Sequence, residues 1–240
     1  GGNVHHSTGS TVAGAGIGST APKFGNTSIA FDGVRDFIDV WGAHDATPGT
    51  GSTDFNFGSG SFTVEAWINL SGSVANEVEG DVEKDNQVIF TTGGWPVAAA
   101  PGWTFYLYGA TTNHRIAFNN TLGQGAVAFA PDTDHREFHP LARKWYHVAV
   151  VRDASTQEAP TGYIFVDGKT QLTWADTGGM AESTSSLRIG DTTHAALYTA
   201  GLYSFAGYMD DIRITKGVAR YTTNFTPEEG EIVSMNSGSV

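Results

Sequence analysis

The stretch between residues 145 and 168 constrains the fold of this chain more than any other. Residues 145–152 are β-branched and aromatic, without Gly, Pro or Asn, and their apolar side chains fall on both faces of an extended chain. This pattern is typical of a central strand that is covered on both sides. Residues 153–162 are rich in turn formers, residues 163–166 resume the strand pattern, and Asp167-Gly168 is a tight-turn dipeptide. We therefore predict a hairpin with a long loop, flanked and covered by the other strands.

The rest of the chain supplies many short strand-like segments. They include residues 28–31, 36–40, 62–68, 87–91, 103–108, 115–118, 187–190 and 207–214. In residues 62–68 the alternation is strict, so that Thr63, Glu65 and Trp67 face away from the apolar side. The 31 glycines suit tight turns, and no long window has a helical period. About ten to fourteen strands at regular spacing predict an all-β protein, a two-sheet antiparallel jelly-roll sandwich.

Charge and cysteine content exclude several classes of function. The net charge of −12 disfavours binding to nucleic acid and to anionic membranes, and it suits a soluble protein or one that binds cations. The chain has no cysteine, so a disulfide framework and a Cys-based zinc site are excluded. No apolar run is long enough for membrane insertion.

The composition divides the chain into three parts. Residues 1–22, mostly Gly, Ser, Thr and Ala, predict an extended N-terminal arm, residues 23–230 the sandwich, and residues 231–240 a C-terminal tail. His5 and His6 are adjacent and project in opposite directions along an extended arm, which does not favour metal binding. Because the chain starts with Gly1-Gly2 and lacks a signal-peptide pattern, we expect a processed product or a piece of a longer protein.

Several of these segments, in this order, resemble the laminin-G-like domains of the concanavalin A type, particularly their bacterial and phage branch. The matching segments are residues 28–33, 62–67, 145–152, 165–168, 187–190, 207–221 and 224–227. The closing run, Lys-Gly-Val-Ala-Arg-Tyr at 216–221 and Asn-Phe-Thr-Pro at 224–227, looks most like copies in phage tail and virion proteins. An additional apolar strand that commonly begins such domains is not clearly present.

The resemblance implies a jelly roll of two curved antiparallel sheets with a binding or structural role. Such domains usually recognise glycans or proteins, and they often bind one calcium ion. We therefore expect a non-catalytic recognition or decoration module, extracellular or on a virion surface, such as part of a phage virion or tail fibre. Its expected partner is a cell-surface or extracellular glycan, or neighbouring virion proteins. Formation of a homo-oligomer is left as an open alternative. A purely structural virion or fibre protein without a ligand is the first alternative.

Asp32 and Asp210 are the predicted calcium ligands. Asp210 alternates with Ile212 and Ile214, which turns its carboxylate toward the apolar side, where a charge needs a cation or several donors. In the resembling family the strand after Phe-Asp-Gly lies near the penultimate strand, and calcium can bind between them. The alternative is that Asp210 accepts backbone N–H bonds, or pairs with Arg213 or Arg35.

A glycanase is the less favoured alternative. Glu79, Asp81 and Glu83 spell the Glu-x-Asp-x-Glu signature of some jelly-roll glycanases, in which the carboxylates share one face of a rigid strand. Here a glycine lies within a highly charged stretch, so we favour a solvated acidic loop, and a loosely held cation over catalysis.

The histidines give no catalytic pattern. His135 and His139 have helical spacing, but Pro140 follows and no helical period surrounds them. His147 lies within the strongest strand and is interpreted as a packed, hydrogen-bonded imidazole, because no Ser or Cys nucleophile motif accompanies it.

Aromatic residues in loops are the predicted ligand-binding residues. Sugars stack on exposed rings while Asp or Asn binds their hydroxyls, and loops at one end of a sandwich often carry binding sites. Trp41, Trp95, Trp174, Tyr198 and Tyr203 fall in predicted loops, whereas Trp67, Trp103 and Trp145 fall on strands and are expected in the core. From these we select as the ligand site Trp95, Asp191, His194, Tyr198 and Tyr203.

Overall fold

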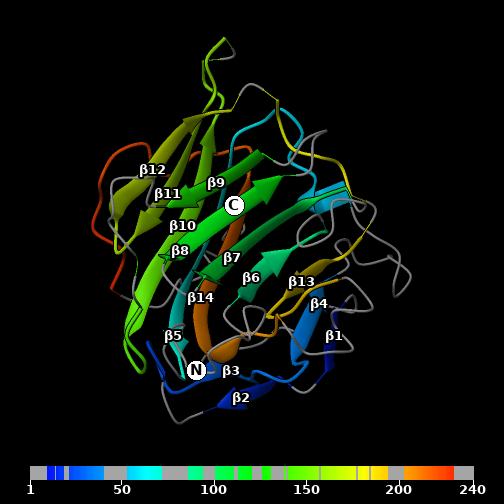
Figure 1. Ribbon diagram of the computed structural model, residues 1–240, viewed down its shortest axis with the longest axis vertical. Helices are drawn as coiled ribbons and strands as arrows, with labels where there is room; N and C mark the ends of the chain where they lie inside the picture. Colours follow the sequence, from blue (N-terminus) through cyan, green and yellow to red (C-terminus); the bar gives the residue numbers. More distant parts are fainter. Residues whose placement is uncertain are drawn as a thin grey trace, which may run out of the picture.

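The structure is a computed structural model, and it confirms the all-β prediction. It describes residues 10–13, 15–18, 22–40, 53–71, 86–93, 101–110, 113–120, 126–130, 138, 140–156, 158–176, 178–183, 185–193 and 203–229. The described strands form two antiparallel sheets of seven strands each, stacked face to face (Figure 1). None of these residues belongs to a helix with the length and hydropathy needed to span a bilayer.

Sheet 1 has the order β1-β4-β13-β6-β7-β8-β9. Its strands are β1 (Ser10–Ala13), β4 (Phe37–Val40), β13 (Leu187–Ile189), β6 (Gln87–Thr91), β7 (Trp103–Ala110), β8 (Asn113–Asn120) and β9 (Ala126–Ala130). Sheet 2 has the order β12-β11-β10-β5-β14-β3-β2. Its strands are β12 (Lys169–Ala175), β11 (Thr161–Val166), β10 (Trp145–Asp153), β5 (Phe62–Leu70), β14 (Ala206–Lys216), β3 (Ser28–Asp32) and β2 (Gly16–Gly18). One short 3-10 turn, η1 (Thr53–Phe55), precedes β5.

The hairpin predicted from residues 145–168 is present, and its first strand, β10, lies in the interior of sheet 2. β10 pairs with β11 on one side and with β5 on the other, and its residues from Tyr146 to Arg152 are buried. Trp145 at its start is only partly buried, so the expectation of a core position for Trp145 is wrong, and its neighbour Tyr146 belongs to the core instead. Trp103 is fully buried, as predicted.

One hydrophobic core fills the space between the two sheets. Sheet 2 contributes the inward residues of β5 and β10, among them Val64 and Val150, and sheet 1 contributes large aromatic rings such as Phe105 and Phe118. The face assignment for β5 is confirmed: Phe62, Val64, Ala66 and Ile68 belong to this core. Burying side chains of this size contributes about 1.5–3 kcal/mol each relative to exposure, so the core is the main source of stability.

The outer face of sheet 2 is also buried at β10, as the apolar residues on both faces of residues 145–152 predicted, and at β5, where the alternation alone does not indicate it. Every residue of β5 is buried, Glu65 included. Residues 217–229 contact Thr63 and Glu65 on this face, and Lys23 and Phe24 cover Trp67. We call residues 217–229 the C-terminal strap. Tyr221 and Phe225 of the strap pack against Ala149, Val151 and Phe165 of the sheet. The phage-like run recognised in the sequence is therefore the segment that covers the outer face.

A β-bulge in β14 changes the direction in which Asp210 points. Asp210 lies opposite Trp67, and Arg213 lies opposite Glu65, so that β14 holds one residue more than β5 between these pairs. The extra residue reverses the alternation. Asp210 consequently lies on the outer face with Trp67, whereas Ile212 and Ile214 pack against the core. The prediction that Asp210 faces the apolar core side is therefore wrong.

Candidate binding site

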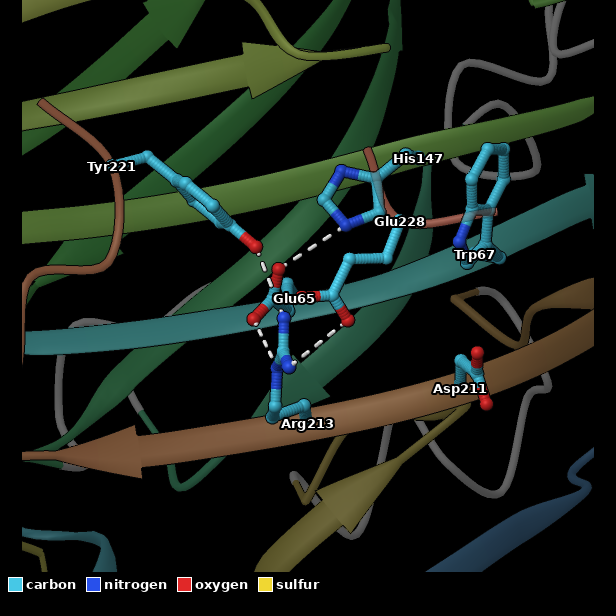
Figure 2. A pocket seen from close by; sticks show the side chains of 7 residues that line it. All are labelled: Glu65, Trp67, His147, Asp211, Arg213, Tyr221 and Glu228. Atoms are coloured by element: carbon cyan, nitrogen blue, oxygen red, sulfur yellow. Dashed lines mark hydrogen bonds and ion pairs between the residues drawn. The ribbon is translucent and has the colours of Figure 1, made fainter. Parts of the chain in front are cut away.

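A small pocket opens on the outer face of sheet 2, beside the C-terminal strap. Side chains from β5, β10, β14 and the strap line it, namely Glu65, Trp67, His147, Asp211, Arg213, Tyr221 and Glu228 (Figure 2). Glu65 and Trp67 share one face of β5 because they are two residues apart, and His147 lies opposite Trp67 on β10. The pairing of the strands thus brings together residues that are up to 163 positions apart in the sequence.

Glu65 is the centre of a buried hydrogen-bond network. One carboxylate oxygen accepts a bond from Arg213 Nε at 2.6 Å, and the other lies 3.2 Å from His147 Nε2. Burial alone would raise the pKa of Glu65, but the hydrogen bonds and charges of His147 and Arg213 outweigh it and lower the pKa below its ordinary value. Glu65 is therefore ionised at neutral pH and acts as a fixed anion at the base of the pocket.

Arg213 links this anion to the strap. Its Nη2 group donates to the hydroxyl of Tyr221 at 3.0 Å, and its Nη1 group lies 3.7 Å from Glu228. Burial raises the pKa of Tyr221 to about 12, with the charge of Glu65 acting in the same direction, so the hydroxyl stays protonated at neutral pH. The Tyr221 ring stacks on Phe225 with centroids 3.6 Å apart. The network thus holds the strap against the sheet.

His147 lies among aromatic rings beside Glu65. It makes edge contacts with Trp67, Tyr221 and Phe225, and its backbone N–H donates to Asp167. Its Nδ1 atom is buried and has no hydrogen-bond partner in the described part of the chain. The interpretation of His147 as a packed, hydrogen-bonded imidazole is confirmed for Nε2.

The rim of the pocket combines charged groups with an aromatic wall. Glu228 has an exposed side chain, and Asp211 is the extra residue of the bulge, with φ of 44°. On the far side, the Lys23 ammonium lies 3.9 Å from the centroid of the Trp67 ring, and Phe24 meets that ring edge-on. Carboxylates, a guanidinium and aromatic rings in one pocket are the groups that bind polar ligands with apolar faces.

The predicted loop site is only partly described. Asp191 and Tyr203 are buried, so the expectation that they present exposed side chains to a ligand is wrong. Asp191 accepts hydrogen bonds from Thr192 N and from Ser204 Oγ, and Tyr203 packs with Val88 and Tyr106 on the outer face of sheet 1. Outside the described residues lie Trp41, Trp95, His194 and Tyr198, and also Glu79, Asp81, Glu83, His135 and His139. Trp174 lies on β12 rather than in a loop.

The register does not place Asp32 and Asp210 side by side. The register places Ala206 opposite Asp32, whereas Asp210 lies four residues further along β14. Both oxygens of Asp210 accept backbone N–H bonds, from Lys23 and Phe24 at 3.0 and 3.1 Å and from Asp211 at 2.9 Å. Within the described ranges, no three His, Asp or Glu side chains gather as metal ligands. Calcium binding by this chain stays a prediction.

Sequence reasoning missed Glu65, Arg213 and Tyr221 as site residues. The signal was a charged residue, Glu65, in a strand otherwise apolar or neutral, because a buried carboxylate requires partners. Each of the three also lies in one of the segments that carry the family resemblance. The register of the strands, which brings these segments together, could not be derived from the sequence patterns.

Comparison with known proteins identifies the fold and a family. The family model described as "Concanavalin A-like lectin/glucanases superfamily" matches residues 45–220. A search of curated proteins found no match. Among solved structures, the binding domain of Paraclostridial Mosquitocidal Protein 1 has a TM-score of 0.55 at 12% identity, over 88% of this chain and 44% of that chain.

Two further solved structures have the same fold. The binding domain of Botulinum Neurotoxin serotype G has a TM-score of 0.54 at 11% identity, over 87% of this chain and 43% of that chain. Domain 4 of AbnA, an extracellular arabinanase from Geobacillus stearothermophilus, was solved in complex with arabinotriose. It has a TM-score of 0.52 at 12% identity, over 88% of this chain and 83% of that chain. The chain spans less than half the length of the two toxin domains, and identities this low establish a shared fold alone.

Proposed function

The chain belongs to the concanavalin A-like lectin/glucanases superfamily, and on that premise we propose that it is a non-catalytic glycan-binding module. The observation that carries this proposal is the pocket on the outer face of sheet 2. There the partly buried ring of Tyr221 lies beside the charged side chains of Asp211, Arg213 and Glu228, and the buried Trp67 forms part of the wall. Sugars need this combination, because their C–H faces pack on rings while their hydroxyls bind carboxylates and guanidinium groups.

The fold supports the same ligand class. Domain 4 of AbnA has this fold over most of its length and was solved with arabinotriose. The net charge of −12 repels sulfated and other anionic glycans, so we propose neutral oligosaccharides as ligands. The pocket is small, so we propose that it accepts a single hydroxyl or hydroxymethyl group of a sugar whose ring stays outside it.

The chemistry of the pocket supports a non-catalytic role. Glycoside hydrolysis requires two carboxyl groups, one of them with a raised pKa so that it can donate a proton. In Glu65, the buried carboxylate of this pocket, Arg213 and His147 lower the pKa instead. Glu65 is therefore held as an anion and is unsuited to be the general acid.

Binding to immobilised oligosaccharides, followed by titration calorimetry, tests the proposal. Neutral oligosaccharides, arabinotriose included, are the probes, and the double variant Asp211→Asn/Glu228→Gln removes the carboxylates of the rim. We expect wild-type binding and a loss of at least about tenfold in affinity, which corresponds to one good polar contact of about 1.4 kcal/mol. The matched control is Glu182→Gln, an exposed glutamate that does not line the pocket.

Two outcomes would contradict the proposal. If the wild type binds no neutral oligosaccharide, glycan binding is wrong. If it binds and the double variant binds equally well, the ligand site lies elsewhere on the molecule.

We further propose that the module is displayed outside the cell or on a virus particle. The resemblance of residues 216–221 and 224–227 to phage virion proteins supports this location, and these residues contribute to the strap. The module would then attach a particle to glycans of a host surface, or contact neighbouring virion proteins. Antibodies raised against the chain should label purified particles in electron micrographs, and unlabelled particles would contradict this location.

A further inference from the structure

The described part of the N-terminal arm, taken from here on as residues 10–13, 15–18 and 22–24, supplies an edge strand to each sheet. β1 lies at the edge of sheet 1 beside β4, and β2 lies at the edge of sheet 2 beside β3. Figure 1 shows both strands at the lower end of the molecule, coloured dark blue. One short segment therefore covers one edge of both sheets. Without it, the backbone groups of β3 and β4 would be open to pairing with another chain.

The pairing of the arm with the sandwich is short. β1 and β4 have four opposed residue pairs, and β2 and β3 have three. The interior strands β5 and β10 have eight. Because each opposed pair adds to the ladder of backbone hydrogen bonds, the two strands of the arm have shorter ladders than an interior strand, and Ala15 between them packs against the core.

The arm is anchored at its C-terminal end, on the outer face of sheet 2. The backbone N–H groups of Lys23 and Phe24 donate to the Asp210 carboxylate at 3.0 and 3.1 Å. The Lys23 ammonium and the Phe24 ring both contact Trp67. A turn at Gly25 and Asn26 follows, and both residues are exposed. Gly25 has φ of 57°, so the chain reverses here through a residue with the widest choice of backbone conformations.

We propose that the arm is exchangeable, so that β3, β4 and the Asp210–Trp67 anchor of one copy bind the arm of a second copy. The contacts made in trans would be the same as those made in cis, so exchange costs no contact energy. The turn at Gly25-Asn26 acts as the hinge: opening it directs the arm to a neighbour. In dilute solution the arm binds its own sandwich, because the effective concentration of a short tether is about millimolar. Where copies are crowded on one surface, trans binding competes with cis binding.

Cysteine trapping in the full chain tests this proposal, because the chain contains no cysteine of its own. Ile17 of the arm lies opposite Ile29 of β3. The separation of opposed Cα atoms in an antiparallel pair fits a disulfide. The variants Ile17→Cys and Ile29→Cys are mixed, unfolded, refolded together and oxidised in a glutathione buffer. A disulfide between the two variants forms a covalent dimer that a non-reducing gel detects.

We expect the yield of covalent heterodimer to increase at least about tenfold when the protein concentration is raised from 1 μM to 1 mM. The upper value reaches the effective concentration of the tethered arm, which is about millimolar, so that binding in trans then competes with binding in cis. The matched control pair is Thr161→Cys and Ala175→Cys, which are opposed in β11 and β12. A tight turn joins those strands, so they cannot exchange, and the control heterodimer should not form above background. A yield from the arm pair that equals the control at both concentrations overturns the proposal.

A second pair protects the test against misfolding. Val12 lies opposite Ile38 at the edge of sheet 1, so Val12→Cys and Ile38→Cys report on the same arm from the other sheet. If Ile29→Cys unfolds the protein, this pair gives the decisive yield. Analytical ultracentrifugation of the wild type provides an independent measurement: a dimer population that grows with concentration supports exchange, and a monomer at 1 mM overturns it.

Discussion

Asp191 is a fully buried carboxyl group whose pKa burial raises to about 6, and this gives the fold a pH dependence. In the unfolded chain its pKa is near 3.8. A folded-state pKa above the unfolded value means that the folded protein binds the proton more tightly. The stabilisation is therefore complete below the unfolded pKa and is lost as the pH rises through 6.

We predict that the free energy of unfolding of the wild type falls by about 1 kcal/mol between pH 5 and pH 7 because of Asp191. The variant Asp191→Asn cannot titrate and should lose this component. Glu65 does not obscure the window, because its pKa is lowered below its ordinary value and its effect lies at more acidic pH. Urea unfolding of both proteins at the two pH values measures the difference. Identical pH dependence in the two proteins would show that Asp191 titrates normally.

Asp210 provides a test of calcium binding. Its two oxygens accept three backbone N–H bonds, and an amide retains one acceptor oxygen, so Asp210→Asn should cost about 1–3 kcal/mol. If protein donors alone hold Asp210, the loss in melting temperature is the same in calcium and in chelator. If the wild type instead melts at a lower temperature in chelator and the variant does not respond, Asp210 binds a cation.

Glu65 should be the most sensitive position of the pocket. Glu65→Gln leaves the shape intact but removes the charge that pairs with the partly buried Arg213, whose Nε lies 2.6 Å from the carboxylate. Breaking a buried pair from one side typically costs about 3–5 kcal/mol, because the remaining charge is left uncompensated. Chemical denaturation measures this loss. A cost below about 1 kcal/mol would mean that water replaces the carboxylate and that the strap is not held by this network.

At the scale of elements, the strap meets the β11–β12 turn at Gly168. The N–H of Phe225 donates to the Gly168 carbonyl at 2.9 Å, and a Cβ atom at Gly168 would collide with the Phe225 carbonyl oxygen. Gly168 has φ of 70°, and Gly217 has a comparable φ of 86° but no heavy atom near its Cβ position. Substitution by Ala would therefore strain the backbone at both positions, but only at Gly168 would the new Cβ atom also collide with the strap.

We therefore predict that Gly168→Ala destabilises the protein by at least about 2 kcal/mol more than Gly217→Ala, which carries only the strain of about 1–2 kcal/mol. Thermal melts of both variants give the comparison. Equal losses would indicate that the strap moves aside at little cost, and that its contact with the turn does not hold it in place.

The strands were predictable because their signal is local. The strict alternation of residues 62–68 and the apolar run of residues 145–152 each correspond to one observed strand, β5 and β10. The direction of Asp210 was not predictable, because one extra residue in β14 reverses the faces and leaves no mark in the composition. Cover on both sides of β10 was predicted from the apolar residues on both faces of residues 145–152 and is confirmed, but the segment that supplies the cover was not identified. The strap has no strand period, and it is identified only by its contacts.

The candidate site was less predictable than the strands. Loop aromatics were expected to form it, yet Tyr203 is buried and the pocket lies on a sheet face instead. Glu65, Arg213 and Tyr221 come from segments far apart in the sequence, and only the strand register brings them together. Single-sequence patterns give the period of each strand but not its partners, so the pocket could not be derived from them.

At the scale of the whole molecule, one core joins both sheets. Large side chains of β7 and β8 pack with the inward residues of β5 and β10 in a single buried cluster. Among the described residues, the two other buried clusters, one on the outer face of each sheet, are much smaller. We predict that the described sandwich unfolds in one transition, so that tryptophan fluorescence and far-ultraviolet circular dichroism report the same midpoint. Two separated transitions would show that the sheets unfold independently.

The pairing of β5 with β14 has a consequence for the order of events on the ribosome. Val64 lies opposite Ile214, 150 residues further along the chain. At a synthesis rate of about 5–20 residues per second, Ile214 is added roughly 8–30 s after Val64, and β5 lacks this pairing partner during that time. Until then one side of β5 is an open edge that can pair with another nascent chain. A message truncated before residue 206 would yield a polypeptide that retains this edge permanently. Incomplete chains should therefore collect in inclusion bodies, while the finished chain closes the sheet and then covers it with the strap.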